Sequence, residues 1–392
     1  MSMDDSAQPD WRSKLARYNV VWDSSSENAG GSMPLGNGEL ALNVWVEPGG
    51  DLLLLIAKSD AWDESSILLK LGRVRVKLMP NLLAGVTTFR QTLDLATATI
   101  TIDASGPAGD AHLSIWVDAD HPMARIELTS SVPTTVEATV EIWRREPRTI
   151  KTQTGDVFKN MTGKDLYPTV ITPDHILPHS ADRLWWCHHN EPREADGYEI
   201  NMRLQGLGGM LDQLPHPLRG RTFGASLGGA GFVAVDDVTL RSEAATRHGL
   251  NLTAFTQHPS TITQWRDALD ALSRESTDRA AHEQWWADFW QRSWLYVESS
   301  SQDEAERLAA FRVSRGYVLQ RFMNACAGRG ASPIKFYGSL FSVGTPDDPD
   351  FRRWGGPGFW FMNSRLVYWP MFALGDFDLL QPWLKMFIDQ LP

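Results

Sequence analysis

The residues best suited to chemistry lie in an aromatic stretch, FWFMNSRLVYWPM, at residues 359–371. It places Asn363 and Arg365 close to Trp360, and the glycine-rich segment RRWGGPG just before it adds Trp354. Indole rings are flat apolar faces that can stack on a sugar ring, and ligand sites combine such faces with a few placed hydrogen-bonding groups. The stretch therefore predicts a sugar platform built on Trp354 and Trp360, with Asn363 and Arg365 as hydrogen-bond donors to the ligand. Tight packing of a loop is the competing interpretation.

A second polar and aromatic stretch, WWCHHNEPR, lies at residues 185–193. In a strand, His188 and His189 would face opposite sides. In a loop that reaches toward the helical half of the chain, Trp186, His189 and Glu191 would contact substrate, and His189 or Glu191 could do acid–base work. Ordinary packing explains the stretch as well. A zinc site needs more ligands than this stretch offers, so we predict no metal and no cofactor.

Three aspartates, Asp347, Asp348 and Asp350, occur in the segment GTPDDPDFRRW. Glycoside hydrolysis usually needs two carboxyl groups flanking the scissile bond, which makes these residues candidate acids. Aspartate and proline are also turn residues, and that interpretation predicts solvated side chains here.

The elements that must position these residues change in type along the chain. Up to about residue 257, apolar and polar residues alternate, as in RVRVKLMP (73–80), TTFRQTLDLATATITIDA (87–104) and GYEINMRLQG (197–206). Many such half-buried strands in series predict an antiparallel sandwich. From about residue 258 the apolar spacing becomes helical. The predicted order is a flexible N-terminus (1–17), a β-super-sandwich (18–257), a helical linker (258–300) and a helical domain (301–392).

The predicted helices have capping residues and broad apolar faces. Ser260 and Ser301 are the predicted N-caps, and helical spacing assigns Leu366, Tyr368 and Trp369 to packing. Nothing in the remaining sequence covers the apolar faces after residue 300, and an exposed apolar patch indicates a missing partner. We therefore expect a completing C-terminal segment or a homo-oligomer.

Composition limits the other partners. The chain has 392 residues and a net charge of −11. Nucleic acids and anionic membrane surfaces are bound through clustered Lys and Arg, so we expect neither partner. No run of about 20 apolar residues is present to span a membrane. The N-terminus shows no signal peptide, which favours the cytoplasm unless a signal peptide was removed on export to the periplasm or beyond.

The motif MPLGNGELALNVWVEPGGDLLLLIAKSDAWDE, at residues 33–64, resembles the N-terminal sandwich of α-L-fucosidase-type glycoside hydrolases (family 95). Those enzymes combine a PLGNG-like opening with an (α/α)6 barrel. More closely, the chain resembles the bacterial family of domain of unknown function 5703, through this motif and the segments WWCHHNE, RTFGASL and SRGYVLQRFMNACAGRG. The resemblance covers most of the chain. It implies a super-sandwich followed by a helical linker and about the first three helices of an incomplete (α/α)6 barrel.

The fucosidase-type barrel helix has the pattern N-x-N-x-x-M-N-Y-W-P, and residues 361–370 stand in its place. Asn363 matches the second asparagine, one of a pair that helps to activate the attacking water in those enzymes. Phe361 replaces the first asparagine, and Val367 replaces a later one. The family's general-acid glutamate and its partner aspartate lie well downstream, so the resemblance implies counterparts beyond residue 392.

The function implied by the resemblance is inverting hydrolysis of an oligosaccharide or glycoside. On this interpretation the chain is the N-terminal part of the enzyme and is inactive alone. One alternative is a non-catalytic glycan-binding module, which would bind sugar through Trp360 without hydrolysis. Another is a phosphorolytic relative with the same domain order, whose turnover would depend on phosphate.

Overall fold

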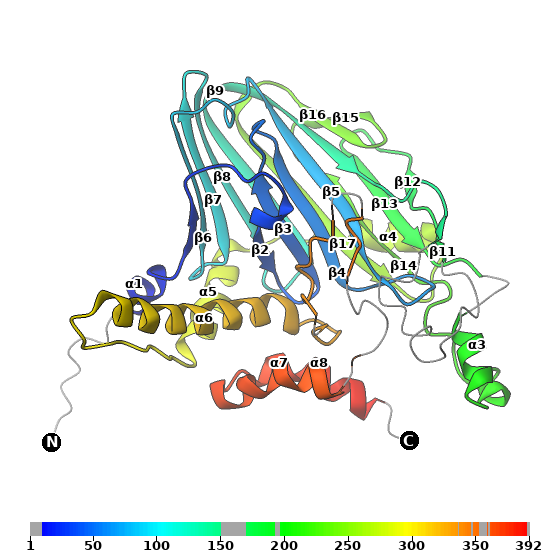
Figure 1. Cartoon of the computed structure of the whole chain (residues 1–392). Helices are drawn as coiled ribbons and strands as arrows, with labels where there is room; N and C mark the ends of the chain where they lie inside the picture. Colours follow the sequence, from blue (N-terminus) through cyan, green and yellow to red (C-terminus); the bar gives the residue numbers. More distant parts are fainter. Residues whose placement is uncertain are drawn as a thin grey trace.

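The structure is a computed structural model that describes residues 10–149, 170–192, 197–335, 337–345, 348–352, 359 and 361–389. Antiparallel β-structure comes first along the chain and most of the helices follow it (Figure 1). This order confirms the predicted sequence of β-structure and then α-helices. In Figure 1 the helices α6 (Glu304–Gly328), α7 (Phe361–Leu374) and α8 (Phe377–Ile388) lie below one end of the sandwich.

Fifteen strands form one hydrogen-bonded system that folds into two layers. The first layer has the order β1 (Val20–Trp22), β6 (Thr88–Asp94), β7 (Thr99–Gly106), β8 (Gly109–Val117), β9 (Met123–Glu141), β17 (Ala245–Gln257), β14 (Thr222–Gly228), β13 (Arg183–His189) and β12 (His175–Leu177). The second has the order β2 (Met33–Gly36), β3 (Leu40–Val46), β4 (Leu52–Trp62), β5 (Leu68–Met79), β9, β16 (Thr239–Ser242) and β15 (Phe232–Asp236). The long strand β9 joins the layers, because residues 123–134 pair with β17 and residues 135–141 pair with β5.

Smaller elements complete the described chain. They are α1 (Trp11–Ala16), η1 (Ala29–Gly31), the strand pair β10 (Arg148–Thr149) and β11 (Val170–Ile171), α3 (Gly197–Leu204), η2 (Gly208–Met210), α4 (Ile262–Leu272) and α5 (Arg279–Gln291). The prediction of a strand for residues 197–206 is wrong, since most of the segment forms the helix α3. It joins neither sheet, so its backbone groups are satisfied within the helix instead of across a ladder.

Alternation explains the core of the sandwich. Val74, Val76 and Leu78 of β5 are each at most 2% exposed and face the other layer. Strands β3 and β4 depart from this pattern, because nearly all of their residues are buried. Their second face is covered too: Trp45 of β3 packs in a cluster with Val343 from the segment that follows α6. The sandwich therefore supports that segment directly.

The helix caps differ from the predicted ones by one or two residues. Thr261, and not Ser260, caps α4, and the Gln264 side-chain oxygen accepts from the Thr261 backbone N–H to complete a capping box. Asp303, and not Ser301, caps α6 through the N–H of the second helical residue. In both cases the neighbouring polar residue was an equally good cap by type.

The PLGNG motif forms the joint between the sandwich and α6. Gly38 has a φ of 90°, and its N–H donates to the carbonyl of Cys326 at 2.8 Å. A methyl group on Gly38 would lie 2.2 Å from the backbone nitrogen of Gly330, so glycine is required there. Asn37 steadies the turn by donating to the carbonyl of Asp118 at 2.8 Å. The motif thus holds the C-terminal end of α6 against the strands.

Arg321 joins the helices to one another. Its side chain is 1% exposed and donates to both carboxylate oxygens of Asp376, at 2.9 and 2.8 Å. It also donates to the carbonyl of Phe289 at 2.9 Å and that of Ser293 at 2.8 Å. Because these partners belong to α5, the segment after it and the turn before α8, one buried guanidinium sets the arrangement of α5, α6 and α8.

The pair α7–α8 exposes many large apolar side chains. These are Phe361, Met362, Leu366, Trp369 and Phe372 on α7, and Phe377, Leu384, Phe387 and Ile388 on α8. Of the three residues predicted to pack within the barrel, Tyr368 is buried, whereas Leu366 and Trp369 are 59% and 51% exposed, so their packing stays a prediction. That these helices begin an incomplete (α/α)6 barrel stays a prediction. In the described part of the chain, no helix is both long and apolar enough to cross a membrane.

Candidate functional site

The WWCHHNE stretch is mostly the strand β13, and its polar side chains are engaged in the fold. Trp186 is 2% exposed, and its indole N–H donates to the carbonyl of Leu71 at 2.5 Å. This places the Trp186 ring in the core between the layers rather than at a surface that a ligand reaches. His189 Nδ1 lies 2.7 Å from Thr222 Oγ1, and its Nε2 lies 3.8 Å from an oxygen of the exposed Glu191. Burial lowers the pKa of His189 below its usual range, and the Glu191 charge opposes this effect.

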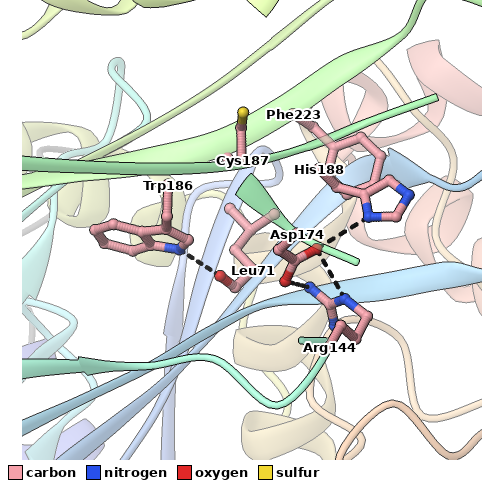
Figure 2. Close-up of a pocket in the computed structure, with 8 residues that line it drawn as sticks. Leu71, Arg144, Asp174, Trp186, Cys187, His188 and Phe223 are labelled. Carbon is pink, nitrogen blue, oxygen red and sulfur yellow. Dashed lines mark hydrogen bonds and ion pairs between the residues drawn. The ribbon is translucent and has the colours of Figure 1, made fainter. Parts of the chain in front are cut away.

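A cluster of charged side chains is buried beside β13, and Figure 2 shows its centre. The Arg144 network, as we name it, consists of Arg144, Asp174, His188, Glu64 and Asp350. Arg144 Nη2 lies 2.7 Å from Asp174 and its Nη1 lies 2.8 Å from Asp350. His188 bridges Asp174 at 2.9 Å and Glu64 at 3.1 Å. All of these side chains are at most 5% exposed.

The proton on His188 is part of this network. Burial by itself would lower the pKa of His188, but the hydrogen bonds and charges of Asp174 and Glu64 outweigh it and raise the pKa to about 9. The imidazole is therefore a cation at neutral pH, and it joins two carboxylates as Arg144 does. The stretch WWCHHNE thus contributes His188, not His189, to the buried Arg144 network.

Asp350 ties the segment that follows α6 to the sandwich. Its carboxylate accepts from the N–H of Lys70 at 2.8 Å and from the indole N–H of Trp143 at 2.7 Å, in addition to Arg144. Its side chain is 3% exposed, so the solvated turn predicted for this aspartate is wrong. Asp348 pairs with the exposed Arg148 at 2.9 Å. Asp347 lies outside the described residues.

The Arg144 network supports a site rather than forming one. The space among Arg144, Asp174, His188 and Trp186 leaves no room for a water molecule. A buried lysine borders it: burial lowers the pKa of Lys70 to about 7, Arg352 contributes to this effect, and Asp350 opposes it. The network was missed by sequence reasoning because Arg144 and Asp350 are 206 residues apart and neither lies in a recognisable motif.

The residues predicted for substrate contact separate into two places. Asn363 is exposed on the first turns of α7. Arg365, on the same helix, lies 4.7 Å from the ring centre of Trp369 and 5.7 Å from that of Phe361. Trp354 and Trp360 lie outside the described residues. His189 and Glu191 lie together at the end of β13, and the structure gives no contact between them and α7.

Within the described residues, no group of three or more His, Cys, Asp or Glu side chains is arranged to hold a metal ion. The acidic and histidine side chains of the Arg144 network are instead occupied by Arg144 and by one another.

Comparisons with known proteins give a family and two distant structures. The sequence profile of a family described as a domain of unknown function (DUF5703) matches residues 21–295. No curated protein is significantly similar in sequence. A human-microbiome protein assigned as a kojibiose phosphorylase aligns with 12% identity and a TM-score of 0.45, over 84% of this chain and 44% of that one. A bacterial glucoamylase in complex with acarbose aligns with 8% identity and a TM-score of 0.40, over 94% of this chain and 53% of that one.

The chain therefore spans about half the length of each of these two structures. At this degree of similarity, what the protein does has to be argued from its own residues.

Proposed function

Because the chain belongs to the DUF5703 family, which is described only as a domain of unknown function, we propose a function from its own site: binding and processing of an oligosaccharide or glycoside at the exposed face of α7. The proposal extends the resemblance between residues 361–370 and the fucosidase-type barrel helix.

The observation that carries the proposal is the chemistry of this helix face. Asn363 offers an amide donor and acceptor to solvent, and Arg365 stacks on Trp369 at 4.7 Å. The Nε of Arg365 is buried and has no hydrogen-bond acceptor among the described residues. Sugar sites need this combination of aromatic faces with a few directed polar groups. A purely packing role does not require an exposed amide beside an unsatisfied guanidinium N–H.

The proposed reaction is inverting hydrolysis, in which Asn363 positions the attacking water. Such a reaction also needs a general acid and a general base, usually two carboxyl groups about 6.5–9.5 Å apart. The helix α7 contributes none, since its sequence FMNSRLVYWPMFAL has no Asp or Glu. A general acid supplied from beyond residue 392 stays a prediction of the resemblance.

The test is turnover by the full-length protein on a panel of nitrophenyl glycosides and natural oligosaccharides, with and without inorganic phosphate. We expect hydrolysis of at least one compound, and Asn363→Ala should lower kcat by about 100-fold, as the loss of one positioned polar group does elsewhere. Met362→Ala is the matched control, because Met362 is 66% exposed on the same helix and has no strong hydrogen-bonding group.

Two results would count against the proposal. Equal loss of turnover in both variants would mean that Asn363 acts only through helix stability. A protein that neither binds nor turns over any member of the panel would show that the exposed face of α7 is not a sugar site. Turnover only with phosphate would instead select the phosphorolytic alternative.

A further inference from the structure

The end of β4 is irregular in a way that redirects its side chains. Strand β4 pairs with β5 in register as far as Ile56, the register shifts at Ala57, and the next pair is Trp62 with Leu68. Residues 58–61 therefore form a bulge relative to β5, while Lys58 still pairs with Leu40 of β3. Bulges of this kind re-aim side chains and are common next to active sites. The bulge carries Lys58 and Asp60 at alternate positions before Trp62.

Hydrogen bonds to one carboxylate oxygen hold Asp60 in place and leave its other oxygen available to a ligand. Lys58 Nζ lies 2.8 Å from Asp60 Oδ1 and 2.7 Å from Glu39 Oε2, and Thr256 donates to the same Asp60 Oδ1 at 2.8 Å. Burial would raise the pKa of Asp60, but Lys58 outweighs burial and lowers it, so the carboxylate is ionised. Among the described residues no group donates to Asp60 Oδ2, and the side chain is 22% exposed.

Trp62 supplies a complementary donor and an apolar face. Its ring is half-buried and meets Phe359 edge-on, with 5.9 Å between ring centres. Asn190 Nδ2 donates to the Trp62 carbonyl at 3.0 Å and so fixes the backbone. No described residue accepts a hydrogen bond from the indole N–H of Trp62, nor is that atom among the buried ones. A donor and an acceptor thus stand two residues apart on one strand, with the Cα atoms of Asp60 and Trp62 about 7 Å apart if the chain is extended there.

Asp60 and Trp62 lie where the sandwich meets the start of α7. The N–H of Ala331, just after α6, donates to Glu39 Oε1. Lys335 Nζ lies 5.6 Å from the ring centre of Trp62 and 5.2 Å from that of Phe359. Phe359 itself is four residues before Asn363. The end of β4 and the start of α7 are therefore neighbours through Phe359.

From this geometry we infer that Asp60, Trp62 and Phe359 form a sandwich-side subsite for one neutral pyranose ring of the glycan. Asp60 Oδ2 accepts from a sugar hydroxyl, the Trp62 N–H donates to a second sugar oxygen, and the two aromatic rings contact the C–H face. The inference rests on the proposed function and adds residues of the sandwich to the glycan site proposed on α7. A sugar carboxylate or phosphate at Asp60 Oδ2 could not donate to that ionised oxygen, so a uronic acid or sugar phosphate bound through its anionic group is disfavoured there even with Lys58 and Lys335 close by.

The experiment measures binding of methyl α- and β-pyranosides of neutral hexoses, deoxyhexoses and pentoses, and of the matching uronic acids, to the full-length protein by calorimetry. We expect at least one neutral pyranoside to bind and its uronic acid to bind more weakly. Asp60→Asn replaces an acceptor by a donor and should raise Kd about tenfold, and Trp62→Phe, which removes the N–H together with part of the aromatic face, should raise it about fivefold or more. Trp22→Phe is the control, since Trp22 is 38% exposed on β1.

The outcomes separate this inference from the proposed function. If the wild-type protein binds a pyranoside and Asn363→Ala weakens binding, but Asp60→Asn and Trp62→Phe leave Kd unchanged, the subsite is refuted and the proposed function stands. If the wild-type protein binds no pyranoside, both fail. A merely structural role for Asp60 would lower the melting temperature and the binding stoichiometry without changing the Kd of the folded fraction, and that result also overturns the inference. Trp62→Phe keeps the test open if Asp60→Asn fails to fold.

Discussion

Replacing Arg144 by methionine tests whether the Arg144 network holds the segment after α6 on the sandwich. The variant keeps most of the side-chain volume but removes the cation between Asp174 and Asp350, whose side chains are 2% and 3% exposed. Breaking a buried ion pair by removing one partner costs about 3–5 kcal/mol, because the remaining charge stays buried without compensation. His188 still pairs with Asp174, so Asp350 should account for most of the loss. We expect about 4 kcal/mol of lost unfolding free energy.

The assay is urea unfolding followed by tryptophan fluorescence, together with the double variant Arg144→Met/Asp350→Asn. Because the second substitution removes the uncompensated charge, the double variant should be more stable than Arg144→Met alone. Arg241→Met is the control: Arg241 pairs with Glu137 on the sheet surface and is 48% exposed, so its loss should cost less than about 1 kcal/mol. A loss below about 1 kcal/mol for Arg144→Met, or strictly additive effects in the double variant, would refute the reasoning.

Three further predictions concern the supports of the site. The unfolding free energy of His188→Gln should be about 3 kcal/mol below that of the wild type near pH 6. This difference should shrink as pH rises through about 9, because a raised histidine pKa stabilises the fold only while the histidine stays protonated. A difference in unfolding free energy that stays constant from pH 6 to 10 in urea unfolding would contradict this. Arg321→Met should lower the unfolding free energy by about 3–5 kcal/mol and expose α8 to limited proteolysis. Unchanged protease resistance would contradict the role of Arg321 in holding α8 in place. Gly38→Ala should lower the melting temperature by several degrees, because its methyl group meets Gly330. Gly49→Ala, whose methyl group meets nothing within 4 Å, should not. Equal melting temperatures of the two variants would contradict the role of the PLGNG motif in joining α6 to the sandwich.

Local pattern was enough to predict the strands and the change to helices. Val74, Val76 and Leu78 alternate with charged residues, and the side of β5 that they share is the buried one. The same reasoning gave a strand for residues 197–206 and was wrong there, because alternation stabilises a strand only when a neighbouring strand is available to pair with it. Capping residues were predicted to within one or two positions for the equivalent reason, since adjacent polar residues compete for one role.

The supports of the candidate site could not be predicted in this way. Asp350 was one of three similar aspartates in a turn-like segment, and its burial depends on Arg144, far away in the sequence. His188 and His189 are adjacent histidines, and the opposite faces of β13 decide that His188 is the buried, charged one. Trp186 was predicted to contact substrate from its aromatic type, which a core position satisfies equally well. The role of Asn363 stays a prediction, because it rests on a resemblance together with the exposure of the helix face.

The most direct test of the proposed glycan site is the affinity of the full-length protein for a glycan that it binds or turns over, measured by calorimetry for the wild type and for Asn363→Ala. The α7 face predicts saturable binding by the wild type and a Kd raised about tenfold or more in the variant, as expected for the loss of one hydrogen-bonding group together with the ligand group it leaves unpaired. Met362→Ala should bind as the wild type does. Equal affinity of the wild type and Asn363→Ala, or no binding of any glycan, would contradict a sugar site on α7.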